Sequence, residues 1–208
     1  MRRKMENKLR ASFTVMNLWA QNKWQDAILY YFKLERIVTP AMEEGLRFHK
    51  EWELETNKTS KLPKVFGDKT FEKPETELHL QVSLSDWLDL SGKLDCLDAQ
   101  TIYEYKTGKQ ESDFYSRTFQ TSVYGLLATY NNRIVTRAEI YHYDQYTKKA
   151  DMSIVWITDQ MLRDTLSWVE TIGSEMHNYF ITNRLYEKYG NYRMTESGVV
   201  RFIKAGTV

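Results

Sequence analysis

Hydrophobic positions at two different spacings divide the chain into helical and extended segments. Spacings of three and four residues predict helices over residues 12–35, 113–130 and 159–189. Thr39-Pro40 predicts the start of another helix, because Thr is a good N-cap and Pro suits the first helical position. Period-two alternation and short apolar runs predict strands, which lie at residues 75–83, 91–98, 101–109, 138–143 and 150–157. This order of elements predicts an α/β fold, a mixed central β-sheet flanked by helices.

The length of 208 residues predicts one domain spanning 1–208. Within it we expect an N-terminal helical part at 11–56, a sheet and helix at 75–157, and a long C-terminal helix at 159–189. The polar stretch 57–74, which is rich in Lys, is interpreted as a solvated loop, with a lid over nucleic acid as the alternative. For the C-terminal residues 190–208, an edge strand and a partner contact both stay open.

Composition narrows the class of protein. Hydrophobic residues make up 42% and charged residues 27% of the chain, which is typical of a soluble globular protein. The net charge of +1 excludes a global basic signature, so any field that attracts nucleic acid is expected to be local. The basic N-terminus is interpreted as a solvated tail, with a DNA-contacting arm as the alternative. Cys96 is the single cysteine, so no internal disulfide is possible, and a reducing, cytoplasmic location is expected. No apolar run approaches the ~20 residues of a membrane span, and no signal-peptide core is expected.

Candidate chemistry is concentrated at two neighbouring strands, Ser91–Asp98 and Thr101–Lys109. Because side chains alternate along a strand, Glu104 and Lys106 would share one face. Asp95 could bring a second carboxylate to the same place, and paired carboxylates attract a hard cation such as Mg²⁺ or Mn²⁺. The alternative is an ordinary cross-strand ion pair on a solvated face, which the Glu-x-Lys spacing alone favours.

Two helices carry further candidates. His49 falls on the stripe of the helix that Thr39 opens, where a hydrogen-bonded core histidine is the commoner role. Gln120 and Tyr124 are four residues apart and therefore share one helical face. The chain contains no Gly-rich phosphate loop, no Cys/His zinc spacing and no nucleophile elbow.

Taken in order, these segments resemble the PD-(D/E)XK nuclease superfamily, and more closely its RecB-like exonuclease branch. The resemblance covers roughly residues 11–188. The motifs that carry it are Gly45-Leu46-Arg47-Phe48-His49, Glu77, Gly92-Lys93-Leu94-Asp95, Glu104-Tyr105-Lys106-Thr107-Gly108 and Gln120-Thr121-Ser122-Val123-Tyr124. Leu94 stands where the family's nominal Pro precedes the first Asp. With one cysteine, the iron–sulfur cluster of some relatives cannot be built.

The resemblance implies a restriction-endonuclease-like core and a set of roles. Asp95, Glu104 and Lys106 would be catalytic. The metal ligands would be His49, Asp95, Glu104 and the backbone carbonyl of Tyr105. The candidate substrate-binding residues are Gln120, Tyr124, Lys109 and Arg117.

The resulting hypothesis is a Mg²⁺- or Mn²⁺-dependent deoxyribonuclease that hydrolyses phosphodiester bonds, with single-stranded DNA ends as the first expected substrate. One alternative is a nuclease subunit that is active only with protein partners, in a DNA repair, replication or CRISPR-adaptation complex. The other is a non-catalytic nucleic-acid-binding relative. Polarity, DNA versus RNA, the identity of the metal and the oligomeric state stay open.

Overall fold

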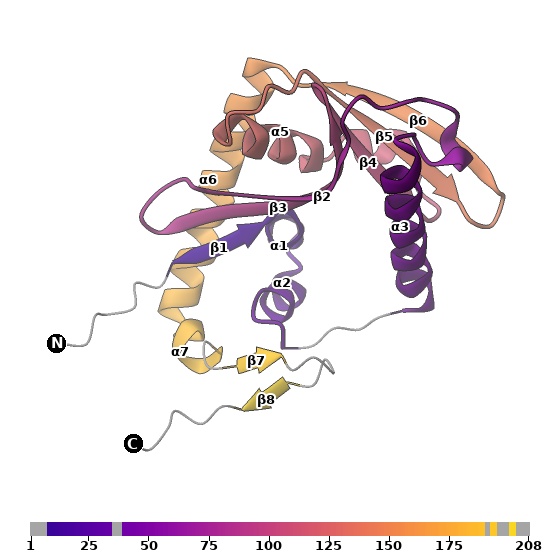
Figure 1. The fold of residues 1–208 in the computed structure, drawn as a ribbon. Helices are drawn as coiled ribbons and strands as arrows, with labels where there is room; N and C mark the ends of the chain where they lie inside the picture. Colours follow the sequence, from indigo (N-terminus) through magenta and orange to yellow (C-terminus); the bar gives the residue numbers. More distant parts are fainter. Residues whose placement is uncertain (1–7, 35–38, 190–191, 195–199, 203–208) are drawn as a thin grey trace. The chain divides into compact units, whose positions relative to one another are not determined.

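The computed structural model describes residues 8–34, 39–189, 192–194 and 200–202. Its helices and strands follow one another in short runs along the chain (Figure 1). Their bounds are β1 Leu9–Ser12, α1 Phe13–Ala20, α2 Trp24–Tyr31, α3 Pro40–Thr59, the 3₁₀ helix η1 Lys64–Phe66, β2 Glu75–Ser83, β3 Leu88–Asp98, β4 Thr101–Thr107, α4 Ser112–Ser116, α5 Gln120–Tyr130, β5 Arg137–Asp144, β6 Lys149–Trp156, α6 Asp159–Thr182, α7 Leu185–Tyr189, β7 Tyr192–Met194 and β8 Val200–Phe202.

The strands form a mixed six-stranded sheet, which confirms the predicted α/β class. The strand order is β1-β3-β4-β5-β6, and β2 also pairs with β3. Pairing is antiparallel for β3 with β4 and for β5 with β6, but parallel for β4 with β5. Helix α5 lies between β4 and β5 in the chain, as a parallel connection requires.

The chain divides into two compact units. The first consists of Met1–Ile37, Ser83–Leu90 and Ser167–Val208, and the second of Val38–Val82 and Ser91–Leu166. In the first unit, Trp19 of α1 and Tyr31 of α2 contact the ring of Phe180 in α6, at centroid distances of 5.9 and 5.0 Å. Aromatic packing therefore holds the described helices of this unit together.

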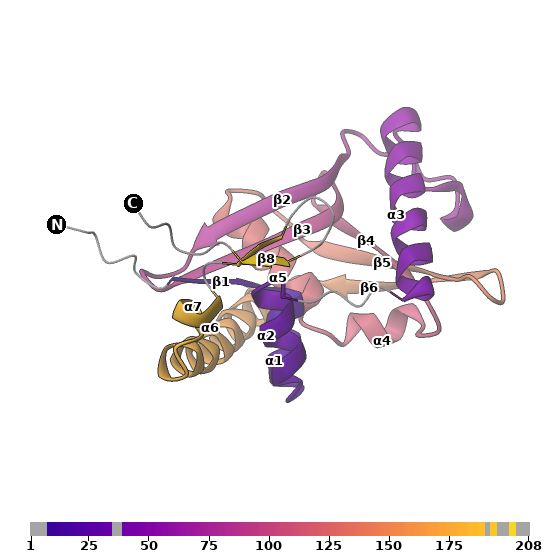
Figure 2. The ribbon, with the colours of Figure 1, turned by 90° about the horizontal axis from the view of Figure 1, so that it is seen from below.

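In the second unit, β4 lies at the centre and is covered on both faces. Tyr103 and Tyr105 point into an aromatic cluster with Trp52 of α3, while α5 also contacts β4. Helix α4 packs along β5 and β6, as Figure 2 shows. Buried β4 thus presents alternate side chains to two different environments, and Glu104 and Lys106 occupy the face opposite the tyrosines.

Several predicted elements are confirmed. Strand β2 spans Glu75–Ser83 as predicted, and the central strands pair around a turn at Ala99, whose φ is 49°. Thr39 caps α3 through a hydrogen bond that its Oγ1 accepts from the backbone N–H of Met42, at 3.3 Å.

Three predicted helices are interrupted where the prediction had them continuous. The helix expected at 12–35 breaks after Ala20, and Asn22 there has φ 59°. The helix expected at 113–130 is divided into α4 and α5 by residues 117–119, and the long C-terminal helix stops at Thr182 before α7. The short strand β1 was not predicted.

The interpretation of residues 57–74 as a solvated loop holds for most of the segment, whose side chains are largely exposed, but is wrong for most of its apolar residues. Leu62 and Phe71 are buried, and Phe66 stacks on Tyr105 with ring centroids 5.6 Å apart and planes at 6°. Lys69 of this segment donates to both carboxylate oxygens of buried Glu139. This segment therefore closes one face of the sheet.

In the C-terminal residues 190–208, β7 and β8 pair with each other in a separate two-stranded sheet. The edge strand considered for the main sheet is therefore not formed by these described residues. The basic residues Arg2, Arg3 and Lys4 of the predicted tail or arm lie outside the described residues.

Candidate active site

The pairing of β3 with β4 brings the two candidate carboxylates to neighbouring strands. Cys96 pairs with Tyr103, and Asp95 and Glu104 each lie one residue beyond this pair. Asp95 Oδ2 accepts a hydrogen bond of 2.8 Å from the backbone N–H of Tyr105. The strand that carries Glu104 therefore also orients the Asp95 carboxylate.

Glu104 is the most enclosed charged group of the site, with 3% of its surface exposed. Its Oε1 accepts from Lys106 Nζ at 2.5 Å and from Gln120 Nε2 at 2.8 Å. Its Oε2 is buried and has no hydrogen-bond partner among the described residues. A buried carboxylate oxygen without a donor is energetically costly, so this atom is available for a ligand.

Helix α3 supplies His49. The Nδ1 atom of His49 lies 3.4 Å from Asp95 Oδ1. Gly45, one turn earlier, permits close approach to β4, because a Cβ at this position would lie 2.9 Å from Thr107 Oγ1. The Gly-x-x-x-His spacing thus lets the helix come near enough for the imidazole to reach the carboxylate.

Burial and charge set the protonation of the site. Burial, together with the charge of Asp95, raises the pKa of Glu104 to about 7. Burial opposes ionisation of Asp95 as well, but its contacts with His49 outweigh that effect and lower its pKa. For Lys106 burial acts to lower the pKa, and the neighbouring carboxylates outweigh it, so the net shift is upward. Lys106 is therefore held as an ammonium beside the carboxylates.

The first turn of α5 reaches the same carboxylate. Gln120 Nε2 donates to Glu104 Oε1 and, at 2.9 Å, to the hydroxyl of Tyr124. Gly92 of β3 packs against the Tyr124 ring, since an added Cβ would lie 2.9 Å from Tyr124 Cε1. The predicted shared face of Gln120 and Tyr124 is thus confirmed and is directed at β4.

The other predicted residues lie elsewhere. Arg117 is ion-paired with Asp113 and exposed, and the Lys109 ammonium lies 5.9 Å from the centroid of the Tyr146 ring. Among the described residues, neither is joined to Asp95 or Glu104 by a hydrogen bond or ion pair. Glu77 forms an ion pair with Lys93, a residue outside the group of Asp95, Glu104 and Lys106. The roles of Lys109 and Arg117 in binding substrate, and of the Tyr105 carbonyl as a ligand, stay predictions.

The donor atoms fit a hard divalent cation. Two carboxylates with a free buried oxygen on Glu104 match the oxygen ligands that Mg²⁺ and Mn²⁺ prefer. Within the described ranges, no group of three or more His, Cys, Asp or Glu side chains is arranged to hold a metal ion. Mg²⁺ is commonly bound by one or two carboxylates, with water and substrate phosphate completing its shell. The fit therefore rests on Asp95 and Glu104, and ligation by His49 stays a prediction.

Two polar residues beside this site, buried His142 and half-buried Tyr115, were missed in the sequence. His142 of β5 is 2% exposed, and its ring contacts Asp151 of β6. Tyr115 of α4 places its ring centroid 5.5 Å from Lys106 Nζ. A histidine inside the apolar run of β5 was the available signal, since a buried imidazole needs polar partners.

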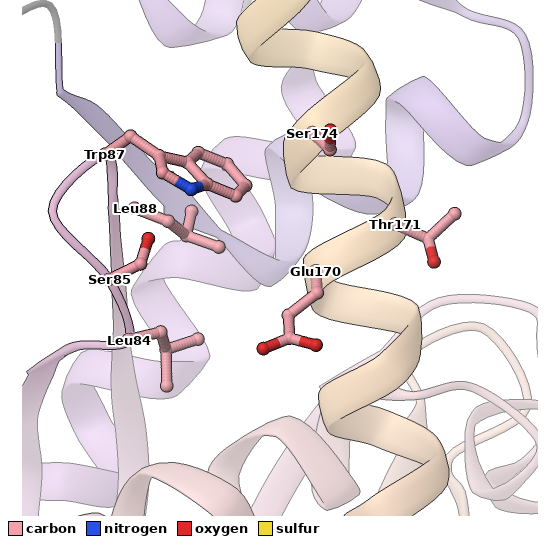
Figure 3. A pocket seen from close by; sticks show the side chains of 7 residues that line it. All are labelled: Leu84, Ser85, Trp87, Leu88, Glu170, Thr171 and Ser174. Atoms are coloured by element: carbon pink, nitrogen blue, oxygen red, sulfur yellow. The ribbon is translucent and has the colours of Figure 1, made fainter.

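A cavity of about 400 Å³ lies in the first unit (Figure 3). It is bounded by the Leu84–Leu88 turn and one face of α6, and none of its lining residues belongs to the candidate site. Gly173 permits close packing there, because a Cβ would lie 3.1 Å from Leu88 Cδ2. The lining residues are Leu84, Ser85, Trp87, Leu88, Glu170, Thr171 and Ser174.

Comparison with known families decides the affiliation. The family model described as PD-(D/E)XK nuclease superfamily matches residues 3–192. The chain belongs to this superfamily. The match covers the five motifs of the sequence resemblance, which is thereby confirmed at the level of the superfamily.

Solved structures support the same fold. The alkaline exonuclease LHK-Exo from Laribacter hongkongensis has a TM-score of 0.55 and 11% identity, covering 88% of this chain and 94% of its own. LHK-Exo in complex with dAMP gives 0.53 and 13% identity, with 89% and 94% covered. The structure of SSO0001 gives 0.51 and 12% identity, with 81% and 76% covered. Comparison with curated protein sequences gave no match. No helix in the described part of this superfamily member is long and apolar enough to cross a membrane.

Proposed function

We propose that the chain is a Mg²⁺- or Mn²⁺-dependent deoxyribonuclease that hydrolyses phosphodiester bonds. The observation that carries this proposal is buried Glu104, whose Oε1 is shared by Lys106 and Gln120 while its Oε2 has no donor. A solvated ion pair, the alternative considered from the sequence, would not bury both charges in this way. Such an arrangement is expensive unless a ligand completes it.

Each residue of the site has a proposed role. Asp95 and Glu104 would hold the cation, with His49 and the Tyr105 carbonyl as further expected ligands. A bound divalent cation supplies positive charge for the phosphate and a nucleophile at neutral pH. Lys106 carries an ammonium group next to Glu104. It would orient the attacking water or stabilise negative charge that develops on the phosphate oxygens.

The remaining candidates would hold the nucleic acid. Gln120 and Tyr124 would position the strand next to Glu104. Lys109 and Arg117 are exposed cations on the segment that follows β4, where contact with backbone phosphates would position a strand without reading its sequence.

Single-stranded DNA ends are the proposed first substrate. The similar protein LHK-Exo is described as an alkaline exonuclease and was solved with dAMP. At identities of 11–13% this likeness supports the exonuclease proposal by analogy in fold.

The test uses end-labelled single- and double-stranded DNA with Mg²⁺, Mn²⁺ or EDTA. Wild type is compared with Glu104→Gln and Lys106→Met, which keep the size of each side chain. The matched control is Glu77→Gln/Lys93→Met, which removes a different carboxylate–ammonium pair, formed between β2 and β3. We expect metal-dependent cleavage by wild type and by the control, and loss of cleavage in both site variants.

The product ladder gives the mode of cleavage. Stepwise loss of nucleotides from one end supports an exonuclease, and internal products overturn that part of the proposal. Cleavage that persists in EDTA, or that the site variants retain, overturns the assignment of the site.

A second candidate is a nuclease that works only within a DNA-processing complex. The net charge of +1 favours it, because an isolated DNA-binding protein usually gains affinity from a basic surface. This candidate would be supported if the isolated protein cleaves DNA weakly and a co-purifying partner raises the rate steeply. Lys106→Met should then abolish the cleavage. Equal DNA binding by Asp95→Ala, Lys106→Ala and wild type, without any cleavage, would instead favour a non-catalytic relative.

A further inference from the structure

His142 lies beside the candidate catalytic lysine in the sheet. In the parallel ladder of β4 and β5, Lys106 and His142 are Cα partners. Partners in register project their side chains from the same face of a sheet. His142 is therefore on the face of Glu104 and Lys106, although it is almost completely buried.

Both ring nitrogens of His142 meet acceptor atoms. Nδ1 lies 2.6 Å from Asp151 Oδ1, and Nε2 lies 2.9 Å from the carbonyl oxygen of Gly108. The Asp151 carboxylate and the Gly108 carbonyl are both acceptors, so a ring nitrogen that carries hydrogen can donate to either of them. Gly108 follows Lys106 by two residues and has φ +121°, a conformation that favours glycine. The imidazole thus holds the backbone at Gly108, directly after the end of β4.

Asp151 extends this contact to α4. Its Oδ2 accepts a hydrogen bond of 2.8 Å from the backbone N–H of Ser112, the first residue of that helix. The hydroxyls of Ser112 and Ser153 are 2.7 Å apart, a second link between α4 and β6. Because α4 is held at its first residue, Tyr115 is kept with its ring near the ammonium of Lys106.

We propose that His142 and Asp151 form a positioning pair for Lys106. The pair fixes the backbone on one side of the lysine through Gly108, and fixes the aromatic ring against its ammonium through α4. Neither residue touches the reacting atoms. The inference rests on the proposed role of Lys106 in phosphodiester hydrolysis.

A structural role alone makes a different prediction. Buried hydrogen bonds of this kind stabilise the sheet whether or not Lys106 acts in catalysis. Their loss would then reduce the amount of folded protein and leave the turnover of each folded molecule unchanged. The two roles therefore separate when kcat is measured per folded molecule.

The test compares His142→Gln and Asp151→Asn with wild type. The control His79→Gln makes the same change at an exposed position of β2. Folded protein is quantified by circular dichroism, and DNA cleavage is measured at saturating metal. We expect kcat to fall about 10–100-fold in both variants. KM for the oligonucleotide should stay near that of wild type, and the control should match wild type in both constants.

Coupling to Tyr115 tests the route through α4. The effects of Asp151→Asn and Tyr115→Leu on kcat should be less than additive, since both act on the same ammonium. Additive effects would overturn this route.

A readout independent of cleavage separates this inference from the proposed function. In protein labelled with ¹³C-lysine, Lys106→Arg identifies the ε-methylene resonance of Lys106 by its absence. This resonance should shift or broaden in His142→Gln and Asp151→Asn and stay in place in His79→Gln. If wild type cleaves no DNA, the proposed function fails while the resonance still decides whether Lys106 is positioned by this pair. An unchanged resonance, or an unchanged kcat per folded molecule, overturns the positioning role.

Discussion

The side-chain amide of Gln120 connects the start of α5 to Glu104 in the middle of the sheet. One Nε2 atom donates to Glu104 Oε1 at 2.8 Å and to the Tyr124 hydroxyl at 2.9 Å, so both of its N–H groups are used. The break at residues 117–119 sets the residue at which α5 begins. The orientation of the buried carboxylate therefore depends on where that helix starts.

Replacing Gln120 tests this dependence. In Gln120→Leu, Glu104 Oε1 keeps only Lys106 as a donor, and a hydrogen bond to a charged group contributes about 1.5–3 kcal/mol. We expect kcat for DNA cleavage to fall roughly 10–100-fold, the rate equivalent of that loss. Steady-state kinetics with a short end-labelled oligonucleotide measure it. Tyr124→Phe, which keeps the ring against Gly92, is the milder comparison and should retain more activity than Gln120→Leu. The reverse ranking would contradict the role of the amide.

Close approach of α3 to β4 gives a second prediction. Gly45→Ala would place a methyl group 2.9 Å from Thr107 Oγ1, so either the Thr107 side chain must rotate or the helix and strand must separate. Overpacking of this kind typically costs about 1–3 kcal/mol of the free energy of unfolding. Urea denaturation followed by circular dichroism measures the loss.

The rescue variant Gly45→Ala/Thr107→Ala provides the control, because it removes the atom that the new methyl group meets. We expect the double variant to be less destabilised than the sum of the two single changes. Strict additivity would show that the close approach at Gly45 does not depend on Thr107.

Local signals explain why the centre of the site was predictable. Alternation places Glu104 and Lys106 on one face, and the turn after Asp98 pairs the two strands that hold both carboxylates. The Gly-x-x-x-His spacing marks the helix that carries His49, although the sequence did not show that this helix approaches β4. These features follow from periodicity within one or two neighbouring elements.

Features that depend on tertiary contacts were not predictable in the same way. The segment that carries Phe66 and Phe71 is polar on average, but its few apolar residues cover the tyrosines of β4. Asp151 and His142 come together only through the register of β5 with β6. The apolar spacing across residues 113–130 also continues through the break before Gln120, so periodicity alone could not locate it.

Cys96 is expected to be chemically inert in the folded protein. Burial, with the charges of Asp98 and Asp95 adding to it, raises the pKa of this thiol to about 12. Because the thiolate is the reactive form, Ellman's reagent at pH 8 should react slowly with native protein. In guanidinium chloride the same reagent should titrate one thiol per chain, since the sequence contains a single cysteine. Rapid reaction of the native protein would show that β3 opens readily at this position.

Replacing the candidate metal ligands one at a time tests the metal site without relying on DNA cleavage. Titration of Mn²⁺ into the protein, followed calorimetrically, should show binding by wild type that Asp95→Asn and Glu104→Gln lose, because each replaces a carboxylate by a neutral amide. His49→Ala should weaken binding about 10–100-fold whether His49 is a ligand or only orients Asp95, since partners of ligands have effects of this size. Glu77→Gln is the matched control, because Glu77 pairs with Lys93 and should leave the affinity unchanged. Equal Mn²⁺ affinity in wild type, Asp95→Asn and Glu104→Gln would place the cation elsewhere and remove the basis for assigning the site to these two carboxylates.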